Sequence, residues 1–429
     1  MKVNVGLVGF GVIGSGVVSL LQEHAPLLKA RSGVEIALTR VADIDPDRTR
    51  GVELTSAKLS RDYREVLDDP NIDIVVELVG GTTAAYQVVA GALEANKHVV
   101  TANKALLYER SAELYAHAKT ARREIRFEGS VAGGIPIIKA MAESLVSDRV
   151  TTIYGILNGT TNFILTRMIE EQWPFQDALA RAKQLGFAEA DPTLDINGSD
   201  AQHKLYLLAS VAFDTMPVKE SILREGIESI ELLDVLYAKE LGYVVKLLGI
   251  AKLENQAMSL RVHPTLIPEG CALASVKNEF NAVMLRSDFL GPALFVGRGA
   301  GARPTATAVV GDIVDIAEGM LQNREFSASR YTSVCDYPTL ASGEIVSRYY
   351  LRLATNERPG ILATITKILG DEQISISAIH QKEGDEPIPI VILTRVAREQ
   401  NVRRAAAAID ALDFTRGRTV VLHVEDIDL

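Results

Sequence analysis

The sequence is poor in the residues that mark secreted or membrane-spanning proteins. Its 429 residues include only two cysteines, Cys271 and Cys335, and neither lies in a CxxC spacing or beside a histidine. We therefore expect neither a disulfide framework nor a zinc site, and a reducing, cytoplasmic compartment fits. No apolar run approaches the roughly 18 residues of a transmembrane helix, so no membrane partner is expected.

Basic residues are also scarce relative to acidic ones. The chain has 45 Lys and Arg against 55 Asp and Glu, for a net charge of -10. The basic residues form no cluster interleaved with aromatic residues, which argues against nucleic acid as a partner. The hydrophobic content of 47% is typical of a well-packed globular protein. A chain of this length is expected to form two or three domains.

The first third of the chain alternates β-rich runs with amphipathic helical segments. This alternation predicts an α/β fold with a doubly wound parallel sheet of the Rossmann type. We assign it to residues 1–131, completed by an Ala- and Val-rich helix within residues 301–335. The expected strands are residues 3–10, 34–43, 72–80, 97–102 and 124–130.

The rest of the chain shows two further patterns. Residues 132–300 contain longer helices and strands, and we interpret them as an α+β catalytic domain for substrate binding and dimerisation. After the turn-rich linker "CDYPTLASGE", residues 346–429 follow a ferredoxin-like βαββαβ order. The expected elements there are strands at 348–354, 374–380, 389–396 and 419–424, with helices at 360–371 and 399–412.

A glycine motif, Gly9-x-Gly11-x-x-Gly14, lies between the first strand and the first helix. The first glycine allows a tight turn, the second lets a pyrophosphate approach the backbone, and the third permits close packing of helix on strand. We therefore predict a dinucleotide cofactor. Its expected contacts are Gly9, Phe10, Gly11, Val12, Ile13 and Gly14.

The end of the second strand leaves the choice between NAD and NADP open. Asp43 is placed to accept hydrogen bonds from a ribose 2′-hydroxyl, which favours NAD. Arg40 and Lys58 are cations that could instead bind the 2′-phosphate of NADP, although Lys58 also fits a solvated surface charge.

Two further charged residues lie within or just after the ends of predicted strands of this sheet. Lys104, in "TANK", could stabilise charge on a substrate, or it could be a lysine in the first turn of an exposed helix. Glu128 precedes a glycine-rich loop, where it could cap the loop or coordinate a cation together with carbonyl oxygens.

The segment "GFAEADPTLDINGSDAQHKL" gathers four carboxylates and one lysine. Ser199-x-x-Gln202 predicts a capping box and a helix that starts at Ser199, with Asp200 and Lys204 one turn apart on one face. A surface ion pair would be the ordinary explanation. The helix is strongly apolar, however, so we expect Lys204 to face a cleft whose acids hold its charge and bind a cationic group of a substrate.

Four stretches occur in the order "GFGVIGSGV", "TANKALL", "GILNGTTNFIL" and "GFAEADPTLDINGSDAQHK". Together they resemble homoserine dehydrogenase over about residues 1 to 335, and "ATNERPGILATITKIL" in the tail is similar to an ACT domain. The resemblance implies NAD(P)H-dependent reduction of L-aspartate 4-semialdehyde to L-homoserine, in the biosynthesis of threonine, methionine and isoleucine.

The resemblance also implies roles for individual residues. Lys204 would donate a proton to the developing alkoxide, Lys104 would lie near cofactor and substrate, and Gly301 would approach the nicotinamide. A monovalent cation, Na⁺ or K⁺, would be held by Glu128 and the backbone carbonyls of Val131, Gly133 and Ile135. The substrate-binding positions would be Glu189, Asp195, Asp200 and Thr160.

The tail is expected to regulate the enzyme. The resemblance implies an amino-acid effector, with L-threonine as the natural candidate, at the strand–helix junction that contains Asn356 and Gly360. It also implies a homodimer or homotetramer; an assembly module with an empty effector site is the alternative. Since the tail holds none of the catalytic motifs, we expect truncation after about Ser342 to leave an active core.

Two other functions fit the sequence less well. Aldehyde oxidation through a thiohemiacetal needs a cysteine beside a base, a setting that neither Cys271 nor Cys335 has. A non-catalytic sensor of nucleotide and amino acid would not need Lys204, Lys104 and four acids.

Overall fold

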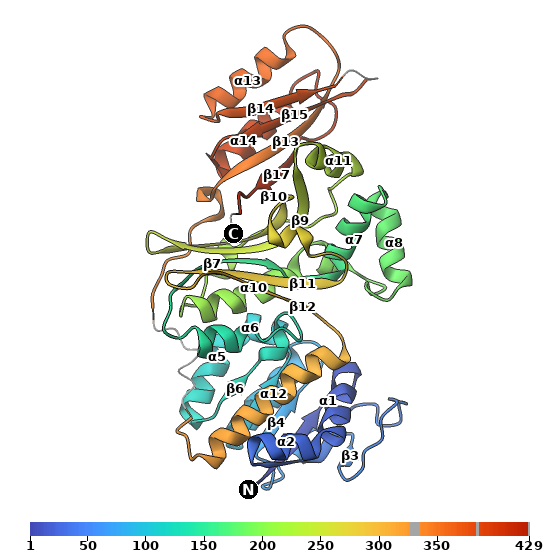
Figure 1. Ribbon diagram of the computed structural model, residues 1–429, viewed down its shortest axis with the longest axis vertical. Helices are drawn as coiled ribbons and strands as arrows, with labels where there is room; N and C mark the ends of the chain where they lie inside the picture. The colour runs from blue at the N-terminus through green and yellow to red at the C-terminus, as the bar shows by residue number, and fades with distance from the viewer. Residues whose placement is uncertain (327–334, 383–385, 428–429) are drawn as a thin grey trace. The chain divides into compact units, whose positions relative to one another are not determined.

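The computed structural model describes residues 1–326, 335–382 and 386–427 (Figure 1). Residues 327–334, in the predicted first domain, and 383–385 and 428–429, in the predicted third, lie outside the described residues. The contacts group the chain into two compact units. Unit 1 comprises Met1–Thr151, Tyr206–Met216 and Asn281–Asp336, and unit 2 comprises Thr152–Leu205, Pro217–Phe280 and Tyr337–Leu429.

Unit 1 contains a parallel sheet of Rossmann type, as predicted. Within the described residues its strand order is β3-β2-β1-β4-β5-β6, which is the order of two mononucleotide-binding halves. The strands are β1 (Lys2–Val8), β2 (Glu35–Ala42), β3 (Lys58–Ser60), β4 (Ile74–Glu77), β5 (His98–Thr101) and β6 (Ile125–Arg126). The helices between and after them are α1 (Val12–Glu23), α2 (Ala25–Ser32), α3 (Arg64–Leu67), α4 (Thr83–Glu94), α5 (Lys104–Ala121) and α6 (Ile137–Lys139).

A helix from late in the chain packs into the core of this unit. α12 (Ala302–Leu321) buries Ala306, Val309 and Ile313 in the same cluster as residues of β1. It lies against α1, where a Cβ on Gly16 would come within 2.7 Å of the Ala302 carbonyl oxygen. The glycine therefore lets the two helices approach closely, so the late helix covers the sheet beside the predicted cofactor turn.

The strand predicted at 124–130 is shorter than expected. β6 covers only Ile125–Arg126, and Glu128–Ser130 form a 3₁₀ turn. The Glu128 amide donates to Asp312 Oδ2 at 2.8 Å, and its carboxylate accepts from the amides of Ile138 and Lys139. Glu128 is therefore held by Asp312 and by the amides of Ile138 and Lys139 rather than by a neighbouring strand, and the sheet ends before it.

Unit 2 is built on a mixed sheet. The order of its described strands is β7-β9-β10-β17-β13-β15-β14, and β8 pairs with β10. Its first strands are β7 (Val150–Ile156), β8 (Leu223–Arg224), β9 (Tyr243–Glu254) and β10 (Ala257–Pro268). The helices of this region are α7 (Gly159–Glu170), α8 (Phe175–Gln184), α9 (Thr193–Ile196), α10 (Ser199–Ala212) and α11 (Leu232–Glu240). The next strands, β11 (Phe280–Ser287) and β12 (Gly291–Arg298), belong to unit 1 apart from Phe280.

The C-terminal domain has the predicted ferredoxin-like arrangement. Its antiparallel strands lie in the order β17-β13-β15-β14, and two helices share a buried core with this sheet (Figure 1). The elements are β13 (Val346–Thr355), α13 (Ile361–Asp371), β14 (Ile376–Gln381), β15 (Ile388–Thr394), β16 (Ala397–Arg398), α14 (Glu399–Asp410) and β17 (Val420–Val424). β17 also pairs in parallel with β10, so the domain continues the sheet of unit 2.

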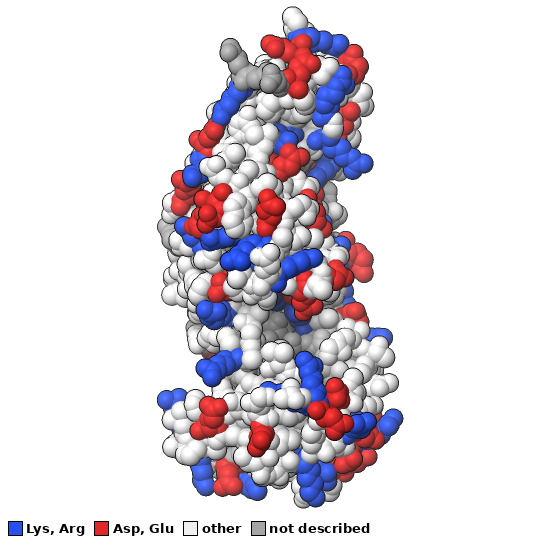
Figure 2. Space-filling model, turned by 90° about the vertical axis from the view of Figure 1, so that its right-hand side faces the viewer, with Lys and Arg blue, Asp and Glu red and all other residues white. Residues whose placement is uncertain are grey.

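The described residues show the distribution of surface charge, the apolarity of the helices and the state of the cysteines. Figure 2 shows basic and acidic side chains interspersed over the face in view. Within the part of the chain that the structure describes, no helix combines the length and apolarity needed to cross a membrane. Cys271 and Cys335 are free thiols.

Candidate active site

The three glycines of the first turn have the backbone roles that the motif predicts. Gly9 has a φ of +98°, and a Cβ there would lie 2.5 Å from the Leu78 carbonyl oxygen. A Cβ on Gly14 would overlap the Gly9 carbonyl oxygen, whereas one on Gly11 would meet open space. The turn is therefore tight at Gly9 and closely packed at Gly14. At Gly11 it is accessible, at the amino end of α1, where a phosphate is favoured.

A cavity of about 620 Å³ opens beside this turn. Phe10, Gly11 and Val12 line it, as does Ala302, which follows the helix-capping Gly301. Four basic side chains also line the cavity: His24, Arg48, Arg50 and Arg303. A nucleotide with several phosphate charges suits such a lining.

Arg40, one of the predicted 2′-phosphate ligands, does not line this cavity. Its Nε donates to Asp69 Oδ2 at 2.6 Å, and Nη1 lies 3.4 Å from Glu65 Oε2. Lys58 is exposed and faces Arg40 in register across β2 and β3. The Arg40 guanidinium is therefore already paired with two carboxylates and is poorly placed to bind a 2′-phosphate.

Arg50 is a cation at the cofactor turn that the sequence reasoning missed. Its guanidinium is almost fully buried and lies 3.1 Å from Asp43 Oδ1, and its Nε donates to the Phe10 carbonyl at 2.6 Å. Asp43 also accepts from the Phe10 amide at 2.6 Å. Arg50 and Asp43 therefore fix the turn together. The available signal was only a cation seven residues beyond the acid at the end of the second strand.

The ends of β4 and β5 carry a polar network beside Lys104. Glu77 is fully buried, and burial raises its pKa to about 7. Its carboxyl group accepts from the Thr101 hydroxyl at 2.6 Å and from the Val79 amide at 2.7 Å. Asn103 caps α5 by accepting from the Leu106 amide, which places the half-buried Lys104 in the first turn. The sequence reasoning did not identify Glu77, whose role depends on burial.

In unit 2, Lys204 and Asp200 form the predicted pair one helical turn apart. Lys204 Nζ donates to Asp200 Oδ2 at 2.7 Å and to the Leu157 carbonyl at 2.7 Å. Both side chains are buried, with about 10% of each exposed. The pair is therefore not a surface ion pair. It is a buried ammonium group, on Lys204, held by one carboxylate and one backbone carbonyl.

Asn158 joins the two aspartates and was not among the predicted site residues. Its Nδ2 lies 2.7 Å from Asp195 Oδ1 and 2.9 Å from Asp200 Oδ2. Its Oδ1 accepts from the Thr161 amide and so caps α7. One side chain thus fixes the start of α7 relative to both acids. Asn158 belongs to the "NGTTN" motif, but its position opposite both acids depends on the fold.

The other predicted substrate residues differ in their surroundings. Burial, together with the charge of Asp200, raises the pKa of Asp195. Thr160 is buried, and its hydroxyl donates to the Phe187 carbonyl at 2.6 Å. Glu189 is exposed and makes no hydrogen bond or ion pair with the described residues. The structure therefore places Asp195, Asp200, Thr160 and Lys204 in one polar cluster, and Glu189 on the loop beside it.

The start of α10 lies at Ser199 as predicted, but the capping box is wrong. The Gln202 amide donates to the Gly198 carbonyl, and the Ser199 hydroxyl accepts from Arg224 Nη1 at 2.6 Å. Ser199 is thus the first helical residue rather than the cap. The capping-box pattern predicted that the Ser199 hydroxyl would accept a helix amide. It accepts instead from Arg224, which lies on a strand distant in sequence.

The predicted cation ligand Glu128 has a structural role. It is buried, and burial raises its pKa to about 7. Both carboxylate oxygens accept backbone amides, from Ile138 at 2.9 Å and from Lys139 at 2.8 Å. These contacts hold the start of α6, and the cation role of Glu128 stays a prediction. No cluster of three or more His, Cys, Asp and Glu suited to a metal occurs among the described residues.

The predicted effector junction has an open backbone. Gly360 is exposed at the amino end of α13 with a φ of +91°, and a Cβ there would meet no other atom within 4 Å. The Asn356 amide donates to the Phe414 carbonyl at 3.0 Å. Asn356 is half-buried, on the segment that links β13 to α13.

Comparison with known proteins agrees with this arrangement. The sequence matches the homoserine dehydrogenase family over residues 136–314, its NAD-binding domain over 9–128 and the ACT domain over 349–414. It is 41% identical over 434 residues to homoserine dehydrogenase of Neisseria gonorrhoeae, with 99% of each chain covered. The chain belongs to the homoserine dehydrogenase family. It is therefore an NAD(P)-dependent oxidoreductase with a C-terminal ACT domain.

Two further comparisons extend along the whole chain. Homoserine dehydrogenase of Pseudomonas aeruginosa is 40% identical over 433 residues, with 99% of each chain covered. The crystal structure of a homoserine dehydrogenase from Thiobacillus denitrificans superposes with a TM-score of 0.95 at 43% identity, covering 99% of both chains. The similarity thus includes the C-terminal domain as well as the catalytic part.

Proposed function

We propose that this enzyme reduces L-aspartate 4-semialdehyde to L-homoserine in the biosynthesis of threonine, methionine and isoleucine. The supporting observation is the buried cluster in which one ammonium, on Lys204, lies against Asp200, and Asn158 joins Asp200 to Asp195. A zwitterionic substrate with an aldehyde needs both signs of charge: acids for its ammonium group and a cationic proton donor for its carbonyl oxygen.

Lys204 supplies the proton in this proposal. A nicotinamide coenzyme, when bound beside the glycine turn, would supply the hydride for the aldehyde carbon. The carbonyl oxygen gains negative charge as its π bond breaks, and an Nζ proton of Lys204 completes the alcohol. Asp200 and the Leu157 carbonyl hold the ammonium group in place beforehand. A preorganised donor of this kind typically contributes roughly 10²–10³ in rate.

The remaining side chains bind and orient in the same proposal. Glu189, Asp195 and Asp200 attract the substrate ammonium, and Thr160 fixes the loop that carries Asn158. Lys104 acts near coenzyme and substrate, supported by its position after the end of a parallel strand, where ligands of such sheets bind.

The direct test is a spectrophotometric assay with the purified chain. L-Aspartate 4-semialdehyde should cause oxidation of NADPH or NADH, and L-homoserine should cause the reverse reaction. Absence of both activities, with coenzyme binding intact, would instead support a non-catalytic sensor.

We propose NADP as the preferred coenzyme. Both oxygens of Asp43 already accept from backbone amides or from Arg50, which leaves this acid poorly placed for a ribose 2′-hydroxyl. Arg48, which is exposed and lines the cavity beside the turn, could bind a 2′-phosphate.

Replacing Arg48 tests this preference. Arg48→Ala should raise the KM for NADPH by about tenfold or more and change that for NADH less, since a charged hydrogen bond is worth about 1.5–3 kcal/mol. Arg40→Ala is the matched control, because Asp69 already neutralises that guanidinium. A selective loss of NADPH in Arg40→Ala alone would return the role to Arg40.

A monovalent cation, Na⁺ or K⁺, is part of the proposal as well. Since amides occupy the Glu128 carboxylate, the donors that suit such a cation are the backbone carbonyls of Val131, Gly133 and Ile135. Glu128 would then shape the loop rather than provide its carboxylate as the main ligand.

The ACT domain is proposed to bind an amino-acid effector, with L-threonine as the candidate. The amino end of α13 behind Gly360 offers amide groups to a carboxylate, and Asn356 offers a side-chain amide. The enzyme is proposed to be a cytoplasmic homodimer or homotetramer, in which Cys271 and Cys335 stay reduced.

Asn356→Ala tests the effector site without disturbing the fold. L-Threonine should inhibit the wild-type enzyme, and the variant should need about tenfold more threonine for the same inhibition, because an effector acts only through different affinities for two states. Identical inhibition curves would place the effector elsewhere. A flat curve for the wild type would leave the domain as an assembly element.

A further inference from the structure

The corner between Asp195 and Asp200 is held by one short segment of chain. The corner comprises residues 196–199, which join α9 to α10. Residues 223–227, here called the strap, begin with β8, which pairs in parallel with β10. Since Asp195 immediately precedes the corner and Asp200 follows it, the position of the corner sets the spacing of the two acids.

The strap contacts the corner directly. Arg224 Nη1 donates to Ser199 Oγ at 2.6 Å, and the Ile227 amide donates to the Ile196 carbonyl at 2.8 Å. A Cβ on Gly226 would overlap that same carbonyl oxygen, so the glycine lets the two backbones touch. Any displacement of the strap therefore reaches the corner.

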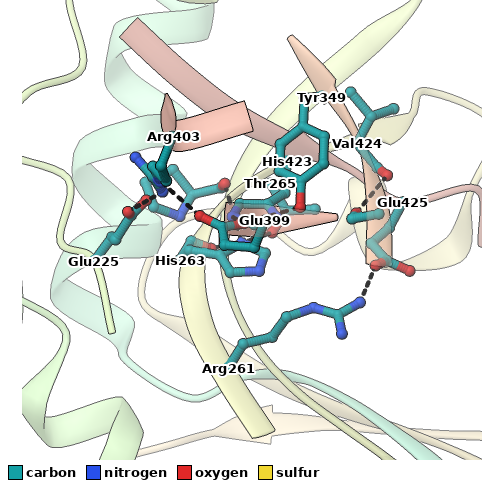
Figure 3. Close-up of polar contacts among 12 residues, drawn as sticks. Glu225, Arg261, His263, Thr265, Tyr349, Glu399, Arg403, His423, Val424 and Glu425 are labelled. Atoms are coloured by element: carbon teal, nitrogen blue, oxygen red, sulfur yellow. Dashed lines mark hydrogen bonds and ion pairs between the residues drawn. The ribbon is translucent and has the colours of Figure 1, made fainter. Parts of the chain in front are cut away.

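The strap is in turn held by the C-terminal domain. The Glu225 amide donates to the Val262 carbonyl of β10 at 2.8 Å, and its carboxylate pairs with Arg403 of α14. Arg403 Nε also donates to Glu399 Oε1 at 2.6 Å. Figure 3 shows the Arg403 guanidinium directed toward both glutamates. Glu399 is buried and accepts from the Tyr349 hydroxyl at 2.9 Å, which anchors this arrangement in the ACT core.

The charges make Arg403 the necessary member of this group. Burial raises the pKa of Glu225; Arg403 opposes that rise, and the negative charge of Glu399 adds to it. Without the guanidinium, two carboxylates in a partly buried space would repel each other. Glu225 would then move away from α14 and displace the strap.

We propose that Arg403 is a positioning residue for the substrate site, acting through Glu225 and the strap on the spacing of Asp195 and Asp200. The inference rests on the proposed function in one respect, that these two acids bind the substrate. The same contacts give the ACT domain a continuous physical connection to the substrate acids.

Two neighbouring arginines of α14 provide the test and its control. Arg403→Met removes the bridge, whereas Arg404→Met removes an exposed guanidinium that pairs with Glu372 inside the C-terminal domain. In the full-length enzyme, Arg403→Met should raise the KM for L-homoserine about fivefold or more, a typical size for coupled sites. The kcat and the KM for coenzyme should stay within about twofold, and Arg404→Met should match the wild type.

A double variant separates positioning from general damage. Adding Glu225→Gln to Arg403→Met removes the unpaired carboxylate, so the KM for homoserine should return toward the wild-type value. A fold that is merely destabilised would become worse. Equal KM values in Arg403→Met and Arg404→Met, or a double variant worse than Arg403→Met, would overturn the proposal.

Amide hydrogen exchange gives a readout that is independent of the substrate. Peptides covering residues 193–204 should exchange faster in Arg403→Met than in Arg404→Met, since the corner loses its support. Equal exchange would also overturn the proposal. If the wild-type chain turned over no homoserine, the proposed function would fail, while hydrogen exchange would still decide whether Arg403 positions the corner.

Discussion

Lys204 and Asp200 show what a sequence can reveal about single residues. Their spacing of four predicted that they lie one turn apart on one helix face, and the 2.7 Å contact confirms that geometry. Asn158 and Arg50 could not be found in the same way. Asn158 contacts acids 37 and 42 positions distant, and Arg50 contacts an acid within a folded turn, so only the fold brings these groups together.

Asn158 offers a prediction at this scale. Asn158→Ser keeps an oxygen that can cap α7 but removes the amide that joins Asp195 and Asp200, whose charges then repel. We expect the KM for the amino-acid substrate to rise about tenfold, while the free energy of unfolding falls by less than about 1 kcal/mol. Steady-state kinetics and urea titration measure the two effects. An unchanged KM would limit Asn158 to helix capping.

At the scale of helices and strands, local patterns located the elements better than their ends. The Rossmann strands and the βαββαβ tail follow from hydrophobic periodicity, which the structure confirms. The capping box at Ser199 and the strand end at Glu128 failed for the same reason. Arg224 and Asp312, both distant in sequence, provide hydrogen-bond partners that a local pattern does not contain.

The contact between β10 and β17 contains a pair of histidines with a testable pH dependence. His263 and His423 stack with ring centroids 3.6 Å apart, and both are fully buried. Burial and the charge of Arg261 lower the pKa of His263 to about 3, and burial with the neighbouring His263 lowers that of His423 well below its usual value. Around them lie Arg403 and Glu399 of α14, Tyr349 of β13 and Glu425, which directly follows β17 (Figure 3).

These lowered pKa values predict that the protein loses stability in acid. Below a pH of about 6.5 the unfolded histidines take up protons and the folded ones do not, so stability falls by up to about 1.4 kcal/mol per histidine for each pH unit. His423→Phe keeps an aromatic stack and should reduce this slope between pH 6.5 and 5. Urea titrations at several pH values measure it. Equal slopes for variant and wild type would show that His423 titrates normally.

At the scale of the whole molecule, the contacts of the ACT domain change the expectation for truncation. Glu425 binds Arg261 and Lys252, and Arg352 binds the fully buried Asp234 at 2.5 Å. Burial alone would raise the pKa of Glu425, but the charges of Arg261 and Lys252 lower it to about 2. The sequence placed the catalytic motifs before the tail, but it could not show that the tail completes a sheet and neutralises buried charges.

Truncation after Ser342 should therefore destabilise the chain rather than leave a sound active core. Removing one partner of a buried pair typically costs about 3–5 kcal/mol, and the cut removes the partners of both Arg261 and Asp234. We expect the truncated chain to aggregate or to unfold at much lower urea concentration than the full chain. A truncated chain with the same unfolding midpoint and full activity would show that the ACT domain is an independent addition.

The most direct test of the central claim is the rate of NADPH oxidation with L-aspartate 4-semialdehyde, measured for the wild type and for Lys204→Ala. If Lys204 donates the proton to the developing alkoxide, its loss should lower kcat by about 10² or more. The dissociation constant of NADPH, measured by fluorescence on the same samples, should stay unchanged. Turnover of Lys204→Ala within a few-fold of the wild type would contradict the account.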